Sequence, residues 1–323
     1  MPARLSLLLL AAAGLVPGCE SGRDHPVVIF HAASLAGALA EVERRMEKAD
    51  PELDLRIEAS GSQVAARKVA ELGRRADLVL SADAAIIDRI LIPAHAAFNL
   101  HFASNQIVLA HGQHSRHTDE IAAENWPGIL LRPGVRLGRC DENLAPIGYQ
   151  TLLVWKLAER HFEKNAPGAG LAERLRSRVA PAHLVADITE LVALLQSRAI
   201  DYAFVFRSIA EEHNLKITPL PPAYNLGDPA RNRDYARVAV EVKMKYSAAP
   251  VRVPGKAVIY GLTIPREAPS PDAAARVAAF LLGDAGRRIL RRYGFDPLEP
   301  PACSGCGRAP QILRRLVAGG VAP

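Results

Sequence analysis

Three serines, Ser34, Ser62 and Ser81, each follow a short apolar run and precede a stretch with helical spacing. Small residues surround them, as in Ser60-Gly61-Ser62, so the backbone can approach a ligand there. A helix N-terminus leaves N–H donors without partners and carries partial positive charge. Converging N-termini with added hydroxyls can therefore bind an anion without a fixed cation. Serines at helix starts are also common N-caps, and the pattern leaves both interpretations open.

Histidines recur at every third position of a polar segment, at His111, His114 and His117, with His95 and His101 upstream. Imidazole is a good ligand for zinc and copper, so metal capture is one interpretation of this cluster. Histidines among polar neighbours are more often part of a solvated loop. We favour the loop and predict no metal site.

Four cysteines are too few for a disulfide framework in a chain of this length. Cys303 and Cys306 form a C-x-x-C near the C-terminus, which outside the cytosol favours a local disulfide over a redox site or half of a zinc site. Cys140 is then left over, and we expect it to be buried as a small hydrophobic residue.

No motif in the chain provides a catalytic group. The sequence contains no G-x-S-x-G, no P-loop and no H-E-x-x-H, and no Cys/His pair has the spacing of a known enzyme family. We therefore predict that the protein is not an enzyme and that it carries no cofactor.

Strands and helices alternate along the chain in a pattern that would bring the serines together. Residues 26–30, 53–58 and 76–80 read as strands, and helical spacing follows each of them. Three such units in succession predict a parallel α/β sheet with ligands near the carboxyl ends of its strands. Further strands are predicted at 105–110, 135–140, 202–206 and 258–264, helices at 151–162, 190–196 and 271–290, a polar turn at 146–149, and a long connection with an edge hairpin within 213–255.

The N-terminus has the pattern of a secreted protein. Arg4 precedes an apolar run over 5–16 that is too short to span a membrane, and Val16-Pro17-Gly18-Cys19 then resembles a bacterial lipobox. Residues 1–18 would be a lipoprotein signal peptide, Cys19 the lipidated N-terminus, and residues 19–26 a polar tether. The alternative is ordinary secretion with Cys19 as an incidental thiol.

Composition excludes a disordered protein and a small disulfide-rich module, because the 323 residues are 49% apolar. This length predicts two lobes or domains. The net charge of +6 is spread along the chain without a long basic block, which favours anionic partners mildly and nucleic acid only weakly. We expect no nucleic-acid partner.

A series of motifs resembles the molybdate/tungstate-binding proteins of ABC transporters, most closely the archaeal-type tungstate-binding branch. The resemblance covers roughly residues 27–300, and the order and spacing of the motifs carry it. In chain order they are His31-Ala32-Ala33-Ser34-Leu35, Glu58-Ala59-Ser60-Gly61-Ser62, Arg67 to Gly73, Ala76 to Asp83, Asn105 to Ala110, Pro146-x-Gly148-Tyr149, Ile200-Asp201-Tyr202, Asn225-Leu226-x-Asp228-Pro229 and Tyr260 to Pro265.

The resemblance implies a type II periplasmic-binding-protein fold, with two α/β lobes that are joined by a two-strand hinge and close over one oxyanion. Lobe one would comprise residues 27–106 and 261–300, and lobe two residues 107–260. Residues 301–323 would form a C-terminal tail that carries the C-x-x-C.

The oxyanion-binding residues implied by position come from both lobes. Neutral donors suit this role, because a hydrogen bond to a charged acceptor contributes about 1.5–3 kcal/mol, and a protonated anion would present an O–H that meets no acceptor. Related proteins often have a tyrosine where this chain has Phe206. The implied set is Ser34, Ser60, Gly61, Ser62, Ile147, Gly148, Ile188 and Phe206.

Two positions depart from the archaeal-type branch, in which two carboxylates complete an octahedral metal sphere. Those positions align with Ala145 and Ala223, and a methyl group cannot ligate a metal. We hypothesise that the oxyanion binds as an intact tetrahedron, or that it is neither molybdate nor tungstate. Asp141, Glu142 and Asp228 lie close enough in sequence to replace the missing acids.

The partners that the resemblance implies are a molybdate or tungstate oxyanion, ABC permease and ATPase subunits, and a membrane surface reached through the lipid anchor. The protein would act as a monomer. The alternatives are a binding lipoprotein for a sulfate- or phosphate-like oxyanion, or for a metal ion held by histidine and cysteine.

Overall fold

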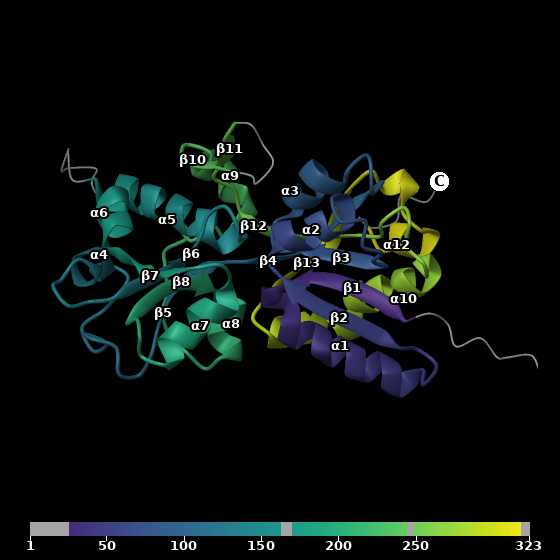
Figure 1. Cartoon of the computed structure of the whole chain (residues 1–323), viewed down its shortest axis with the longest axis horizontal. Coiled ribbons are helices and arrows are strands. Elements are labelled where there is room, and N and C mark those ends of the chain that lie inside the picture. Colours follow the sequence, from purple (N-terminus) through teal and green to yellow (C-terminus); the bar gives the residue numbers. More distant parts are fainter. Residues whose placement is uncertain (1–25, 163–169, 244–248, 318–323) are drawn as a thin grey trace, which may run out of the picture.

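The computed structural model describes residues 26–162, 170–243 and 249–317. Two α/β lobes, each built on one main sheet, lie side by side (Figure 1). The N-terminal and C-terminal parts of the chain, purple and yellow in Figure 1, share the first lobe, and the middle of the chain forms the second. The predicted two-lobe α/β architecture is confirmed.

The first lobe contains a six-stranded sheet in the order β13-β4-β12-β3-β1-β2. Its strands are β1 (Val27–Ala32), β2 (Leu55–Ser60), β3 (Leu78–Ser81), β4 (Asn99–Asn105), β12 (Val258–Thr263) and β13 (Asp296–Ser304). Its helices are α1 (Ala36–Ala49), α2 (Ser62–Ala70), α3 (Ala84–Ile86), α10 (Pro271–Leu282), α11 (Asp284–Arg292) and α12 (Gln311–Arg314), with short turns of other helix types at Ala33–Leu35, Ile87–Leu91 and Cys306–Arg308.

The second lobe contains a five-stranded sheet in the order β7-β6-β8-β5-β9. Its strands are β5 (Ile107–His111), β6 (Leu137–Cys140), β7 (Val179–Val185), β8 (Tyr202–Phe206) and β9 (Lys216–Thr218). Its helices are α4 (Trp126–Leu130), α5 (Pro146–Phe162), α6 (Leu171–Arg178), α7 (Ile188–Gln196), α8 (Arg207–Glu212) and α9 (Asn232–Tyr235), after a 3-10 turn at Pro229–Arg231. The predicted hairpin is present as β10 (Ala239–Val242) and β11 (Val251–Pro254), but it forms a sheet of its own.

Parallel pairing aligns the two strands that lead to the serine-containing junctions. β1 pairs with β2 in a register that sets Ala32 opposite Ser60, and β3 pairs with β1 on its other side. Both strands therefore end at the same edge of the sheet, as the alternation of strands and helices predicts. Ser34 and the Ser60–Ser62 turn consequently emerge next to one another.

Two segments cross between the lobes and are tied together by a third. The predicted strand 105–110 is broken at Gln106, so that β4 belongs to the first sheet and β5 to the second. β12 returns beside β4, with Val258 opposite Asn105. The Ile107 amide donates to the Asn225 carbonyl and the Val258 amide to the Leu226 carbonyl, both at 2.8 Å. This is the two-strand hinge, braced by the Asn225-Leu226 motif.

Three expectations about elements were wrong. The helix expected at 271–290 is broken at Gly283 into α10 and α11. The two helices can pack closely because Gly286 has no side chain, and a Cβ there would lie 2.2 Å from the Leu281 carbonyl oxygen. The polar turn expected at 146–149 is the first turn of α5, which begins at Pro146 as helices often do.

The third error concerns the C-terminal tail, which begins as part of a sheet. At the edge of the first sheet, β4 pairs with Ala302, Cys303 and Ser304.

Within the described part of the chain, no helix combines the length and the apolar character needed to cross a membrane.

Candidate anion-binding site

A small cavity of about 20 Å³ lies where the two lobes meet. From the first lobe it is lined by Ala32, Ala33, Ser34, Ser60, Gly61, Ser62 and Ala82, and from the second by Ala145, Pro146, Ile147, Ile188 and Phe206. Seven of the eight residues implied by the resemblance are therefore brought together, and every lining side chain is uncharged. The exception is Gly148, whose amide donates to the Ala145 carbonyl at 3.0 Å.

Two glycines let backbone segments approach closely around this cavity. A Cβ at Gly61 would lie 2.9 Å from the Leu144 carbonyl oxygen of the other lobe. A Cβ at Gly148 would lie 2.3 Å from the Asp141 carbonyl oxygen. Gly61 thus permits contact between the lobes, whereas Gly148 permits the first turn of α5 to pack against the segment that follows β6.

The serines at the junctions do not cap their own helices. The helix starts at Ala32 and Gly61 have no side-chain cap, so the N-cap interpretation of Ser34 and Ser62 is wrong. Ser62 instead accepts a hydrogen bond from the Ala82 amide at 3.0 Å. Ser81 donates to the Asp83 carbonyl at 2.6 Å and lies outside the lining.

The second lobe presents two helix N-termini to the cavity. α5 begins at Pro146 and α7 at Ile188, and Asp187 caps α7 by accepting from the amides of the two residues after Ile188. Among the described residues, no acceptor receives a hydrogen bond from the Ile147 or Ile188 amide. Both amides are thus available to an anion, in the environment that helix N-termini favour.

None of the acids considered as replacements for the missing carboxylates lines the cavity. Ala145 itself is in the lining, while Ala223 is not. Asp141 accepts from the Asn143 amide at 2.7 Å, and Asp228 caps the 3-10 turn after it by accepting from Ala230. Glu142 forms ion pairs with Arg139 at 2.7 Å and Arg176 at 2.8 Å.

Phe206 lines the cavity, and its ring packs against a tyrosine that sequence reasoning missed. Phe206 contacts Tyr260 edge to face, with ring centroids 6.0 Å apart. Tyr260 is fully buried on β12, and its hydroxyl lies 2.8 Å from the Ser34 hydroxyl. The Tyr260-Gly261 motif on the returning strand was the only sequence signal for this contact.

A buried hydrogen bond beside the cavity joins the lobes. Tyr149 of α5 donates to Asp83, the residue after Ala82, at 2.5 Å. Lys256, in the segment leading back to β12, lies 2.8 Å from the same carboxylate. Burial alone would raise the pKa of Asp83, but Lys256 and the Tyr149 hydroxyl hold it below its usual value. Burial and the adjacent Asp83 raise the pKa of Tyr149.

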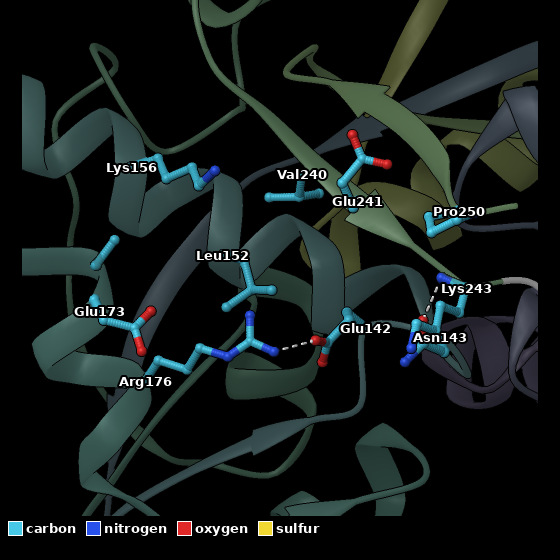
Figure 2. A pocket seen from close by; sticks show the side chains of 11 residues that line it. Glu142, Asn143, Leu152, Lys156, Glu173, Arg176, Val240, Glu241, Lys243 and Pro250 are labelled. Carbon is cyan, nitrogen blue, oxygen red and sulfur yellow. Dashed lines mark hydrogen bonds and ion pairs between the residues drawn. The ribbon is translucent and has the colours of Figure 1, made fainter.

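A larger cavity of about 450 Å³ lies within the second lobe, between α5, α6 and the hairpin (Figure 2). It is lined by acids and bases, among them Glu142, which Figure 2 shows bonded to Arg176. Glu173 and Glu241 add carboxylates without an ion-pair partner in the described structure. Three bases, Lys156, Arg176 and Lys243, line the same cavity, so its charges of both signs give no site specific for an anion. The residues that the resemblance implies line the small cavity instead.

The histidines of the cluster lie in different surroundings. His111 is buried on β5, contrary to our expectation of a solvated loop, and Thr118 lies 3.0 Å from its Nδ1. His117 pairs with Glu120 at 2.8 Å. Across the described ranges, no group of three or more His, Cys, Asp or Glu side chains could hold a metal ion.

The C-x-x-C forms a disulfide between Cys303 and Cys306, at the end of β13. Cys140 is buried, and burial raises the pKa of its thiol. Cys19 lies outside the described residues.

A model of bacterial extracellular solute-binding proteins matches residues 27–296 of the chain. The chain belongs to this family. A solute-binding protein of Petrotoga mobilis is 35% identical over 294 residues, covering 91% of this chain and 90% of its own length. The molybdate/tungstate-binding proteins WtpA of Pyrococcus abyssi and Thermococcus kodakarensis are 31% and 32% identical, covering 97% and 96% of this chain and 98% and 94% of their own lengths.

Solved structures of solute-binding proteins share the fold. The periplasmic molybdate-binding protein of Azotobacter vinelandii has a TM-score of 0.60 at 15% identity, over 83% of this chain and 98% of its own. The sulfate-binding protein SubI of Mycobacterium tuberculosis has a TM-score of 0.61 at 14% identity, over 85% and 88%. At these identities the likeness shows that this solute-binding protein has the two-lobe fold, but it does not identify the ligand.

Proposed function

We propose that this solute-binding protein captures molybdate or tungstate in the interlobe cavity and delivers it to the permease of an ABC importer. The observation that carries the proposal is the cavity itself, which offers serine hydroxyls from one lobe, free helix-terminal amides from the other, and no charged side chain. The names of the WtpA relatives support molybdate and tungstate as the ligands.

The oxyanion binds as an intact tetrahedron in this proposal. The Ala145 methyl group lines the cavity where a ligating carboxylate is expected, and Asp141, Glu142 and Asp228 are engaged elsewhere. A crystal structure of the complex tests the coordination. Four oxygens around the metal support the proposal, and a carboxylate oxygen at bonding distance contradicts it.

The location that we propose rests on the family and on the signal-peptide pattern of residues 1–18. We place the protein outside the cytoplasm as a monomer, anchored through a lipidated Cys19 after removal of residues 1–18, with permease and ATPase subunits as partners. It performs no catalysis in this role, since the chain contains no recognised catalytic motif.

Thermal unfolding of the mature, delipidated protein against molybdate, tungstate, sulfate, phosphate and arsenate tests the ligand. An anion at 100 times its dissociation constant should stabilise the folded protein by about 2.7 kcal/mol. We expect molybdate and tungstate to raise the melting temperature most, and a bulky substitution such as Ser34→Phe to abolish the shift. Sulfate as the best ligand would favour the alternative oxyanion, and no shift with any anion would refute the proposal.

A chelator control separates oxyanion binding from metal binding. Isothermal titration with molybdate should be insensitive to EDTA. Chelator-reversible binding of zinc or copper, without oxyanion binding, would instead support the histidine and cysteine alternative.

A further inference from the structure

The three serine hydroxyls that line the anion cavity each have a hydrogen-bonding partner in the protein. The Ala82 amide donates to Ser62 at 3.0 Å, and the Lys68 ammonium donates to Ser60 at 3.3 Å. The Tyr260 hydroxyl lies 2.8 Å from Ser34. Since a hydroxyl has one proton and two lone pairs, a serine that accepts from the protein keeps its proton for the cavity.

The direction of the Ser34–Tyr260 bond follows from the chemistry of its two hydroxyl groups, since either oxygen could donate by geometry alone. A phenol is a stronger donor and a weaker acceptor than an alcohol, so Tyr260 donates to Ser34. Ser34 then directs its own proton towards the cavity that it lines.

Lys68 fixes the orientation of the Ser60 hydroxyl. An ammonium group has three donors and no acceptor, so Ser60 can only accept from it. Glu58 lies 2.5 Å from Lys68 and also accepts from Arg74, so the three side chains together carry one net positive charge. This charge attracts any anion, whereas the direction that Lys68 imposes on the Ser60 hydroxyl distinguishes an anion that carries a proton from one that does not.

We propose that Tyr260 and Lys68, which do not line the cavity, are positioning residues that hold Ser34 and Ser60 as hydrogen-bond donors and so select oxyanions that carry no proton. This inference rests on the proposed function and deepens it. An anion with an O–H needs an acceptor, and a serine whose lone pair is already engaged is a poor one. Ser81 shows the contrast, because it donates to the Asp83 carbonyl and takes no part in the cavity.

The test compares molybdate, which is fully deprotonated at pH 7, with arsenate, which is similar in size and carries a proton. Isothermal titration of Tyr260→Phe and Lys68→Met gives the ratio of molybdate affinity to arsenate affinity. We expect this ratio to fall roughly tenfold in each variant, because a serine released from its donor can accept from the arsenate O–H. Lys68→Arg keeps a donor and should restore the ratio.

Two further variants separate this role from a structural or a purely electrostatic one. Tyr235→Phe removes another buried tyrosine hydroxyl, which donates to the Pro222 carbonyl, and Glu58→Gln changes the charge beside Lys68. Both should leave the ratio unchanged. Should Tyr260→Phe fail to fold, the comparison of Lys68→Met with Lys68→Arg decides the question.

The outcomes distinguish the inference from the function beneath it. An unchanged ratio in Tyr260→Phe and Lys68→Met, or an equal loss of both affinities, overturns the positioning role while molybdate capture stands. Wild-type protein that binds neither molybdate nor tungstate overturns the proposed function, and the inference falls with it.

Discussion

At the scale of single residues, the site relies on neutral donors. Three hydroxyls and the Ile147 and Ile188 amides give five donors around the cavity. At about 1.5–3 kcal/mol each, their gross contribution is about 8–15 kcal/mol, which has to exceed an association cost of several kcal/mol. None of the basic residues that the structure describes lines this cavity, so net charge can steer an anion but does not hold it.

Sequence pointed to serines of this cavity but not to how their protons are directed. The pattern of small residues after strands drew attention to Ser34 and Ser62 and equally to Ser81, while Ser60 was implied by the resemblance. Their partners could not be found, because Tyr260 lies 226 positions from Ser34 and the Ala82 amide carries no side-chain signal. Gly148 belongs to the implied set but does not line the cavity, and sequence does not show that its amide is already bonded to the Ala145 carbonyl.

Replacing Ala145 tests the tetrahedral site directly. Ala145→Asp would place a carboxylate in a cavity that contains no charged side chain, close to the bound dianion. We expect at least a tenfold loss of molybdate affinity by isothermal titration, because like charges at short range repel strongly away from water. Ala145→Asn, of the same size but neutral, is the control and should lose less. Tighter binding by Ala145→Asp would mean that the carboxylate ligates the metal.

At the scale of elements, hydrophobic periodicity predicted most strands and helices. β8 has the predicted bounds, and α7 begins at Ile188 under the Asp187 cap, two residues before the predicted start. The errors arise from tertiary contacts. Gly283 breaks a continuous amphipathic pattern because two helices pack around it, and β13 is proline-rich, so its pairing with β4 has no period-two signal.

The disulfide belongs to this element and not to the anion site. Cys303 and Cys306 close a turn where β13 leaves the edge of the first sheet, and neither residue lines the cavity. Reduction should lower the free energy of unfolding by up to about 2 kcal/mol, the chain-entropy value for so short a loop. Chemical denaturation with and without reductant measures this change, and Cys303→Ser is the matched variant. A large change in molybdate affinity on reduction would contradict the separation of the two sites.

At the scale of the whole molecule, capture depends on contacts that exist only when the lobes meet. Gly61 faces the Leu144 carbonyl, and Tyr149 donates to Asp83 beside the cavity. Asp83 is also held by Lys256 on the segment that returns to β12. Residues at the strand ends of the first lobe thus line the cavity and also form the hydrogen bond between the lobes. Anion binding and lobe closure are therefore coupled through neighbouring residues.

This buried carboxylate gives lobe closure a pH dependence. The pKa of Asp83 is lowered in this structure, where the lobes meet. The stabilisation that the Asp83 carboxylate gives to the contact between the lobes is therefore fully present above the ordinary carboxyl pKa of about 3.9 and is lost as the pH falls through the lowered value. Because Asp83 stays ionised near neutral pH, we expect it to give molybdate affinity no pH dependence there. Below about pH 4, small-angle scattering of the anion-free protein should show a growing open population; the anion is left out because molybdate itself takes up protons in this range.

Removing one hydroxyl tests the closing bond itself. Tyr149→Phe leaves the ring packed in α5 but deprives Asp83 of its donor from the other lobe. A hydrogen bond to a charged group contributes about 1.5–3 kcal/mol, so molybdate affinity should fall about tenfold or more, mainly through faster release. Scattering of the anion-free protein would show a more open average. Tyr235→Phe, within the second lobe, should change neither quantity. If Tyr149→Phe bound and released molybdate like the wild type, closure would rest on the anion contacts alone.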